Sequence, residues 1–130
     1  SKIVEVDGVP MLDGGIVDSI PVARSMELGH GKNVVVLTRN YGFRTHAKDR
    51  KIPHFIYKHY PRLRVALSRR REAYNRQLDF VEELERSGSV VCIRPERPVE
   101  VGRMEKDVSK LEALYEEGVA LGDKFCKDCF

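Results

Sequence analysis

Residues 9–21 read VPMLDGGIVDSIP, and the interpretation of the whole chain starts from this stretch. An apolar run ends at Asp13, and two glycines follow. Open α/β sheets place their chemistry where a strand ends in such a carboxylate and the backbone then turns on glycines. Asp18 or Ser19 can cap a helix whose first turn contains Pro21. Asp-Gly-Gly is also an ordinary turn sequence, so the alternative is that Asp13 only accepts backbone amides of its own turn.

The apolar pattern on both sides of this stretch predicts alternating strands and helices. We expect strands at 3–6, 9–12, 33–38 and 89–93, helices at 20–28 and 61–86 and from about 107 onward, and one or two helical turns at 53–60. The pair Asp7-Gly8 predicts a hairpin between the first two strands. The run NVVVLT at 33–38 is typical of a strand buried on both faces of a parallel sheet. If the 9–12 strand runs parallel to it, residues 39–52 lie on the same sheet edge as Asp13. This order favours an α/β fold with a mostly parallel sheet.

The helix expected at 61–86 carries both an apolar stripe and many arginines. The stripe consists of Leu63, Leu67, Tyr74, Leu78, Val81 and Leu84. One flank carries Arg62, Arg69 and Arg76, and the other carries Arg64 and Arg71. Arg70 falls inside the stripe, so we expect it to pair with a carboxylate or a carbonyl.

The composition is that of an ordinary globular domain. The chain has 130 residues, 42% of them hydrophobic and 33% charged. No apolar run is long enough to span a membrane, and the first residues lack the apolar stretch of a signal peptide. Residues 39–76 hold 12 Lys/Arg and 2 Asp/Glu, a balance of +10, whereas the remainder holds 11 and 18, a balance of −7. This basic block suits an acidic partner or the acidic remainder of the same fold.

The Asp13-Gly14-Gly15 motif, with Pro21 eight residues after the aspartate, resembles the aspartate motif of patatin-like lipid acyl hydrolases. Residues 34–39, VVVLTR, and 93–95, IRP, are similar to the bacterial patatin-like esterase branch of that family. The resemblance spans the whole chain but only the C-terminal half of the family's catalytic domain. The 130 residues contain no G-x-S-x-G and no glycine-rich oxyanion loop.

The resemblance implies a three-layer α/β/α fold, of which residues 1–130 are the C-terminal portion. It also implies a carboxylic ester hydrolase with a Ser-Asp dyad, in which Asp13 is catalytic and Gly14 and Gly15 shape the turn. The expected substrate is an acyl lipid or a small ester, and no cofactor or metal is expected. The family often has Asn at the position of Ser19. The N-terminal half would supply the serine, so we expect this chain alone to be inactive.

Partners and location follow from the same interpretation. We expect a cytoplasmic protein that contacts anionic membrane peripherally through Arg62, Arg69 and Arg76. An uncovered sheet edge would favour a homodimer. The alternative function is a non-catalytic binding module whose basic helix contacts anionic lipid or nucleic acid. Nucleic acid is the less favoured partner, because the arginines flank an apolar stripe instead of sharing one exposed face.

The other reactive side chains give weaker signals. The spacing of Asp7, Asp13 and Asp18 matches no calcium loop. Cys92 is expected to be a buried small hydrophobe, and Cys126 with Cys129 forms a C-x-x-C in a frayed, functionally silent tail. We expect surface or packing roles for the four histidines, His30, His46, His54 and His59.

Overall fold

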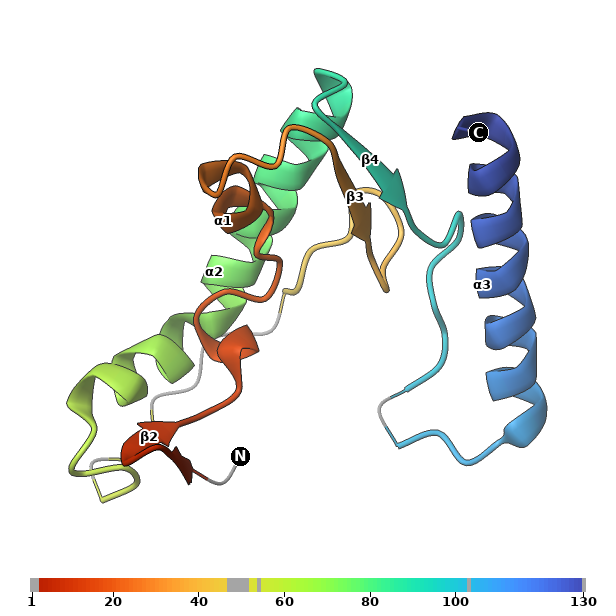
Figure 1. The fold of residues 1–130 in the computed structure, drawn as a ribbon. Coiled ribbons are helices and arrows are strands. Elements are labelled where there is room, and N and C mark those ends of the chain that lie inside the picture. The colour runs from red at the N-terminus through yellow and green to blue at the C-terminus, as the bar shows by residue number, and fades with distance from the viewer. Residues whose placement is uncertain (1–2, 47–51, 54, 103, 130) are drawn as a thin grey trace. The chain divides into compact units, whose positions relative to one another are not determined.

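The computed structural model describes residues 3–46, 52–53, 55–102 and 104–129, and it shows a mixed α/β chain (Figure 1). The elements in order are β1 (Val4–Val6), β2 (Val9–Met11), the 3-10 helix η1 (Gly14–Ile16), α1 (Val22–Glu27), β3 (Asn33–Val36), α2 (Pro61–Arg86), β4 (Val90–Ile93) and α3 (Val108–Cys129). The chain divides into two compact units. The first unit comprises Ser1–Pro21 and Arg44–Phe80, and the second comprises Val22–Phe43 and Val81–Phe130.

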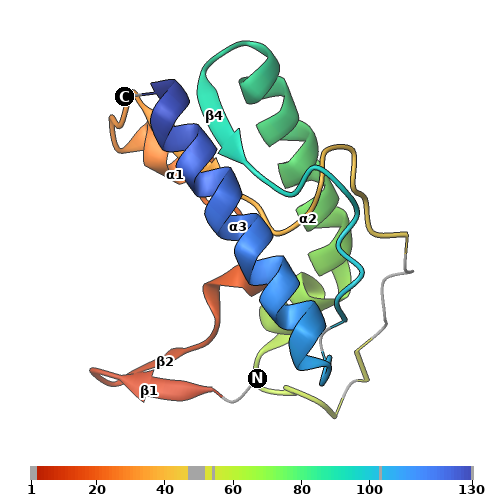
Figure 2. The same ribbon diagram turned by 90° about the vertical axis from the view of Figure 1, so that its right-hand side faces the viewer.

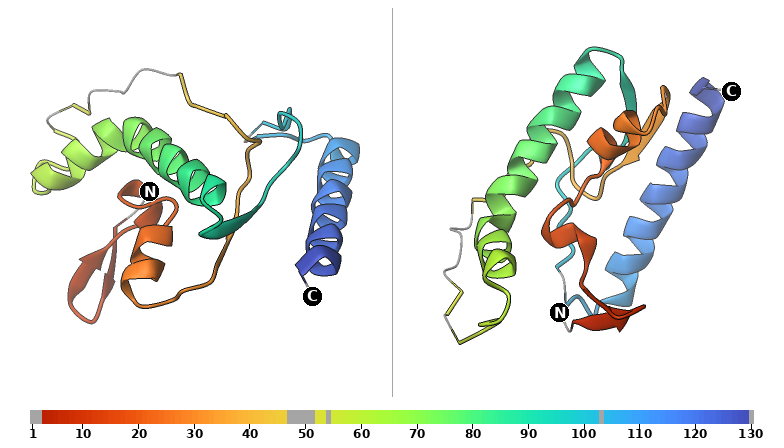
Figure 3. Two further views of the ribbon diagram at one scale, coloured as in Figure 1. Left: turned by 90° about the horizontal axis from the view of Figure 1, so that it is seen from above. Right: turned by 60° about the vertical axis from the view of Figure 1, so that its left-hand side comes forward.

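The first unit begins with the predicted hairpin, drawn in dark red in Figure 3. β1 and β2 are antiparallel, with Val6 opposite Val9. Asp7 and Gly8 both have positive φ, 50° and 76°, which the tight turns of two-residue hairpins require. In the part of the chain that the structure describes, β2 pairs with β1 and not with β3. The expectation that Asp13 and the end of β3 share a sheet edge is therefore wrong, because β2 makes its backbone hydrogen bonds with β1 in the hairpin.

The second unit contains a parallel pair of strands. β3 and β4 pair in register from Asn33 opposite Val90 to Val36 opposite Ile93. Parallel neighbours need a long crossover connection, and α2 lies within that connection. The parallel strand-helix-strand unit therefore runs β3–α2–β4. A single parallel pair and a single antiparallel pair are described, so a mostly parallel sheet is not found among these residues.

The α2 helix has the limits that the sequence predicted (Figure 1). It begins at Pro61, whose missing N–H would have no partner in the first turn of a helix. It ends just before Gly88, which has φ 74° and donates its N–H to the Glu85 carbonyl at 3.0 Å. The Ser89 N–H reaches back to the Leu84 carbonyl at 2.9 Å, which completes the usual glycine C-cap pattern.

The apolar stripe of α2 is its buried side. Leu78 is 3% exposed in the first unit and Val81 is fully buried in the second. The remaining stripe residues are partly buried: Leu63, Leu67, Tyr74 and Leu84. The predicted stripe is therefore confirmed.

The α3 helix lies beside β4 in the second unit (Figure 2). Asp107 caps it, because its Oδ1 accepts the Ser109 N–H at 3.0 Å and the Lys110 N–H at 3.4 Å. The helix continues through Cys129, so the expected frayed tail is wrong. Cys126 is exposed.

The burial of β3 differs from the expectation for a strand of a central parallel sheet. Val35 and Leu37 are 8% and 7% exposed, whereas Val34 and Val36 are 53% and 71% exposed. Side chains alternate between the two faces of a strand, so one face of β3 lies in the core and the other faces solvent. A sheet of two strands covered mainly on one side produces this alternation, and the apolar run alone could not distinguish the two cases.

Residues before α2 form turns instead of the expected helical turns. The Ile56 N–H donates to the Pro53 carbonyl at 3.0 Å, and the Tyr60 N–H donates to the Tyr57 carbonyl at 2.8 Å. Tyr57 has φ 54°, a left-handed conformation that cannot continue a helix. His54 lies outside the described residues.

Truncation of the buried stripe should destabilise the fold. We expect Leu78→Ala to lower the free energy of unfolding by about 2–5 kcal/mol, because it removes buried methyl groups and leaves a cavity. Urea denaturation followed by circular dichroism measures this change. Leu28→Ala is the matched control, because Leu28 is 60% exposed and should change stability by less than about 0.5 kcal/mol. Equal effects of the two substitutions would show that Leu78 does not belong to the core.

Candidate functional site

The Asp13-Gly14-Gly15 stretch forms a tight helical turn directly after the hairpin. Asp13 is the N-cap of η1, and its Oδ1 accepts the Gly15 N–H at 2.9 Å. The Asp13 carbonyl accepts the Ile16 N–H at 3.2 Å, and Ile16 is buried at 4% exposure. The Asp13 side chain is exposed. The turn therefore holds a carboxylate at the surface of the first unit on a backbone that its own hydrogen bonds fix.

The two glycines of this turn have different requirements. A Cβ atom at Gly15 would lie 3.2 Å from Asp13 Oδ1, which is tighter than most real contacts of a Cβ atom. It would also lie 3.9 Å from Ser19 Oγ. A Cβ atom at Gly14 would meet no described atom within 4 Å. The expectation that the turn itself needs glycine is therefore supported at Gly15, where a side chain would push against the carboxylate.

The Gly15 carbonyl connects the turn to α2 through a hydrogen bond. It accepts the Ser19 hydroxyl at 2.7 Å and the Arg70 Nε–H at 3.1 Å. The prediction that Arg70 would find a carbonyl or a carboxylate is confirmed. Ser19 is used to bind the backbone of the turn, which gives its hydroxyl a structural role.

Gln77 makes a second connection between α2 and the segment after the turn. Its Oε1 accepts the Ser19 N–H at 3.1 Å, and its Nε2–H donates to Asp18 Oδ1 at 2.6 Å. Sequence reasoning missed Gln77, because a polar residue on a helix gives no signal until its partner is known. Arg70 and Gln77 are seven residues apart, so they lie on one side of α2 and can hold the same segment.

The other predicted site residues are not brought to Asp13 by a described contact. His30, His46 and His59 are exposed, as expected for surface residues. In the described ranges no group of three or more His, Cys, Asp or Glu side chains could hold a metal ion.

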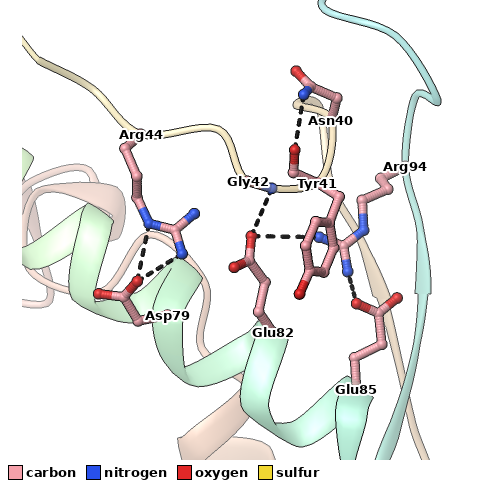
Figure 4. Close-up of polar contacts among 8 residues, drawn as sticks. All are labelled: Asn40, Tyr41, Gly42, Arg44, Asp79, Glu82, Glu85 and Arg94. Carbon is pink, nitrogen blue, oxygen red and sulfur yellow. Dashed lines mark hydrogen bonds and ion pairs between the residues drawn. The ribbon is translucent and has the colours of Figure 1, made fainter.

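A second polar cluster lies at the carboxyl ends of β3 and β4, in the second unit (Figure 4). The Arg94 side chain, 8% exposed, forms an ion pair with Glu85. A second ion pair joins its Nη1 to Glu82 Oε1 at 3.9 Å. The Arg94 guanidinium also stacks on the Tyr41 ring, 5.0 Å from its centre. Glu82 Oε1 accepts the Gly42 N–H at 2.9 Å, so one carboxylate serves both the cation and the loop after β3.

Of residues 39–52, which the sequence predicts on the same sheet edge as Asp13, the structure describes 39–46 and 52. Arg39 stacks on Phe43 at 5.0 Å and donates through Nη1 to the Val99 carbonyl at 3.4 Å. In the first unit, Arg44 Nη2 donates to Asp79 Oδ1 at 2.6 Å (Figure 4). These arginines are therefore used in packing and ion pairs within the chain.

Cys92 of β4 is half-buried and lines an open cavity of about 300 Å³ between β4 and α3. The other lining residues are Val91, Ile93, Arg94, Glu96, Leu121, Lys124 and Phe125. Burial, reinforced by the Glu82 carboxylate, raises the pKa of the Cys92 thiol. The expected role of Cys92 as a small hydrophobe fits this environment, since the neutral thiol is the favoured form.

The comparisons with known proteins give one family match. A family model described as "Domain of unknown function (DUF6363)" matches residues 60–129, more than half of the chain. The match covers α2, β4 and α3, and Asp13 lies outside it. No curated protein and no solved structure matches. None of the helices within the described residues is long and apolar enough to cross a membrane.

Removal of the buried Arg94 cation should destabilise the fold far more than removal of an exposed cation. We expect Arg94→Met to lower the free energy of unfolding by about 3–5 kcal/mol, because it takes the counter-charge from the buried Glu82 carboxylate. The control is Lys124→Met, which removes an exposed ion pair with Glu96 (3.5 Å) and should cost less than about 1 kcal/mol. Urea denaturation measures both variants, and an equally small effect at Arg94 would contradict this account.

The Cys92 thiol should react slowly in the folded chain. With Cys126→Ser and Cys129→Ser as background, we expect Ellman's reagent to label Cys92 more slowly than in guanidinium chloride, since the thiolate is the reactive form. The midpoint of the rate against pH should also lie higher in the folded than in the unfolded chain, as the raised pKa requires. Identical midpoints in the two states would show that folding does not perturb this thiol.

Proposed function

We propose that this chain, which belongs to the DUF6363 family, forms the C-terminal part of a patatin-like serine hydrolase. In this proposal the complete domain is a three-layer α/β/α fold that hydrolyses carboxylic esters of acyl lipids. Asp13 is the base of a Ser-Asp dyad, and the N-terminal half supplies the serine and the oxyanion donors. The observation that carries the proposal is the presentation of Asp13, an exposed carboxylate on a turn fixed by Gly15.

The arrangement around Asp13 suits a general base, which must hold its carboxylate in one position to accept a proton. A serine hydroxyl needs a base within hydrogen-bond reach to become a useful nucleophile. Asp13 Oδ1 is held by the Gly15 N–H, which limits the rotation of the carboxylate. Burial of a carboxylate strengthens it as a base, whereas Asp13 is exposed in this chain. In the proposal the N-terminal half covers it and so excludes water.

The proposed reaction proceeds in two steps. Asp13 takes the proton of the serine hydroxyl while the serine oxygen attacks the ester carbonyl. The protonated aspartic acid then gives this proton to the leaving alcohol, and an acyl-enzyme remains. Water attacks the acyl-enzyme in the second step, with Asp13 again accepting the proton, and the carboxylic acid leaves as the serine recovers its hydrogen.

Arg70 and Gln77 act as positioning residues in this proposal. Arg70 holds the Gly15 carbonyl, and Gln77 holds both Ser19 and Asp18. Catalytic groups lose effectiveness when they are displaced by about 1 Å, so the clamp by α2 supports the position of Asp13. The family match begins at residue 60 and therefore includes the helix that provides both side chains.

The test is ester hydrolysis by a polypeptide that joins this chain to a patatin-like N-terminal half. We expect Asp13→Asn to lower kcat/KM for p-nitrophenyl butyrate by at least about a hundredfold, since general-base catalysis contributes at least that factor. The 130-residue chain alone should be inert, because it lacks the G-x-S-x-G nucleophile.

The matched control is Asp123→Asn, which removes an exposed carboxylate of α3 and should leave the activity unchanged. If Asp13→Asn retains full activity, Asp13 is only the cap of η1 and the dyad assignment fails. If the joined polypeptide is folded and inert toward esters, the patatin-like function itself is wrong.

A further inference from the structure

Residues 55–62, FIYKHYPR, expose apolar and cationic side chains together at the start of α2. Phe55 is 77% exposed, and Ile56 and Tyr60 are 39% and 40% exposed. Lys58, His59 and Arg62 are exposed beside them in the sequence. We call these eight residues the 55–62 segment. Exposed apolar side chains that adjoin one another, as Phe55 and Ile56 do, are a feature of interaction surfaces, whereas a single exposed one is not.

The backbone presents the 55–62 segment in a defined shape. The Tyr60 N–H donates to the Tyr57 carbonyl at 2.8 Å, and Tyr57 adopts a left-handed conformation with φ 54°. Arg64 of α2 reaches back through Nη2 to the Ile52 carbonyl at 3.4 Å. The segment is therefore folded back against the helix by turns, with Phe55 at an exposed position.

The charge around the 55–62 segment has one sign. Residues 55–71 contain six Lys/Arg and no Asp or Glu. Arg69, about two turns beyond Arg62 along α2, is exposed as well. Arg76, which the sequence interpretation had included in a membrane-binding row, forms an ion pair with Glu72 at 2.5 Å. Because Arg76 is paired with Glu72, the positive charge is concentrated in the first turns of α2 and in the segment before it, and not along the whole helix.

We infer that the 55–62 segment docks this protein on anionic lipid bilayers. Phe55 and Ile56 enter the boundary between headgroups and acyl chains, Tyr60 lies at headgroup level, and Lys58 and Arg62 bind lipid phosphates. Aromatic rings with polar ends favour this interface, and cations near an anionic leaflet are attracted to it. The inference concerns binding alone, and it does not depend on ester hydrolysis by Asp13.

The same features argue against nucleic acid as the partner. Single-stranded nucleic acids are bound by aromatic platforms, and Phe55 and Tyr60 could stack on bases, but the exposed aliphatic Ile56 beside them has no role in such a platform. A helix that enters a groove gathers its cations on one exposed face, whereas the exposed Arg62 and Arg69 of α2 flank an apolar stripe and Arg76 is paired with Glu72. Exposed apolar side chains combined with cations are the pattern of a bilayer surface anchor.

The absence of tryptophan from the 130 residues allows a direct test. In the full chain, Phe55→Trp introduces a single indole, and Met104→Trp is the control because Met104 is also largely exposed, at 82%. We expect the indole emission of the Phe55→Trp variant to shift to shorter wavelength with vesicles of phosphatidylcholine and phosphatidylglycerol, and not with pure phosphatidylcholine. The emission of the Met104→Trp variant should not shift with either vesicle.

Co-sedimentation with the same vesicles measures affinity. Phe55→Ser should weaken binding by about tenfold through loss of apolar burial. Lys58→Glu combined with Arg62→Glu should weaken it by at least about tenfold through lost attraction to the anionic surface. Lys32→Glu combined with Arg97→Glu makes the same change in net charge at exposed positions elsewhere and should have little effect.

Three results would overturn the inference. The first is an unshifted emission of the Phe55→Trp variant with anionic vesicles. The second is equal loss of binding in the Lys32/Arg97 and Lys58/Arg62 variants, which would indicate attraction by net charge alone. The third is a response of the Phe55→Trp indole to a single-stranded oligonucleotide but not to vesicles, which would make nucleic acid the partner. Hydrolysis of soluble p-nitrophenyl butyrate is measured without a bilayer, so failure of one proposal leaves the other unaffected.

Discussion

The second unit depends on the Arg94 guanidinium, which is held between two carboxylates and an aromatic ring. Arg94 follows β4, Glu82 and Glu85 belong to the last turns of α2, and Tyr41 belongs to the loop after β3. Arg94 thus joins the end of α2, which lies close to it in the sequence, to the distant loop after β3. Two charges removed from water are stabilising only when their geometry is well satisfied, so this cluster tolerates few alternative arrangements of the segments. Removal of one member would leave a buried charge without its partner, even where the intact cluster adds little net stability.

The first unit uses hydrogen bonds to neutral backbone groups for the same purpose. The Gly15 carbonyl accepts one hydrogen bond from Ser19 and one from Arg70, and Gln77 binds the segment that follows. In both units a side chain of α2 forms hydrogen bonds to the backbone of a short turn. These directional hydrogen bonds add to the burial of Ile16 in the first unit and fix the orientation of each turn.

The sequence predicted what depends on local signals. Pro61 and Gly88 bound α2, Asp7-Gly8 turns the hairpin, and the apolar stripe selects Leu78 and Val81 for burial. For Arg70 the sequence predicted the kind of partner, a carboxylate or a carbonyl, because a cation inside an apolar stripe needs a hydrogen-bond acceptor. The hairpin pairing of β1 with β2 was predicted from its turn, whereas the parallel pairing of β3 with β4 was not, because an apolar strand pattern does not state which strand edge is used. Gln77 and the Arg94 cluster were missed, since their partners lie up to 59 residues away in the sequence.

The two exposed valines of β3 have a consequence for how the chain behaves before it is folded. Residues 33–38 combine β-branched side chains, no net charge and no proline, which is the composition of segments that pair between molecules. Lys32 and Arg39 stand directly at the two ends of this run. Charges in such positions act as gatekeepers, because stacking identical segments would bring like charges together. Lys32 and Arg39 therefore place like charges where copies of this strand would stack before the chain has folded.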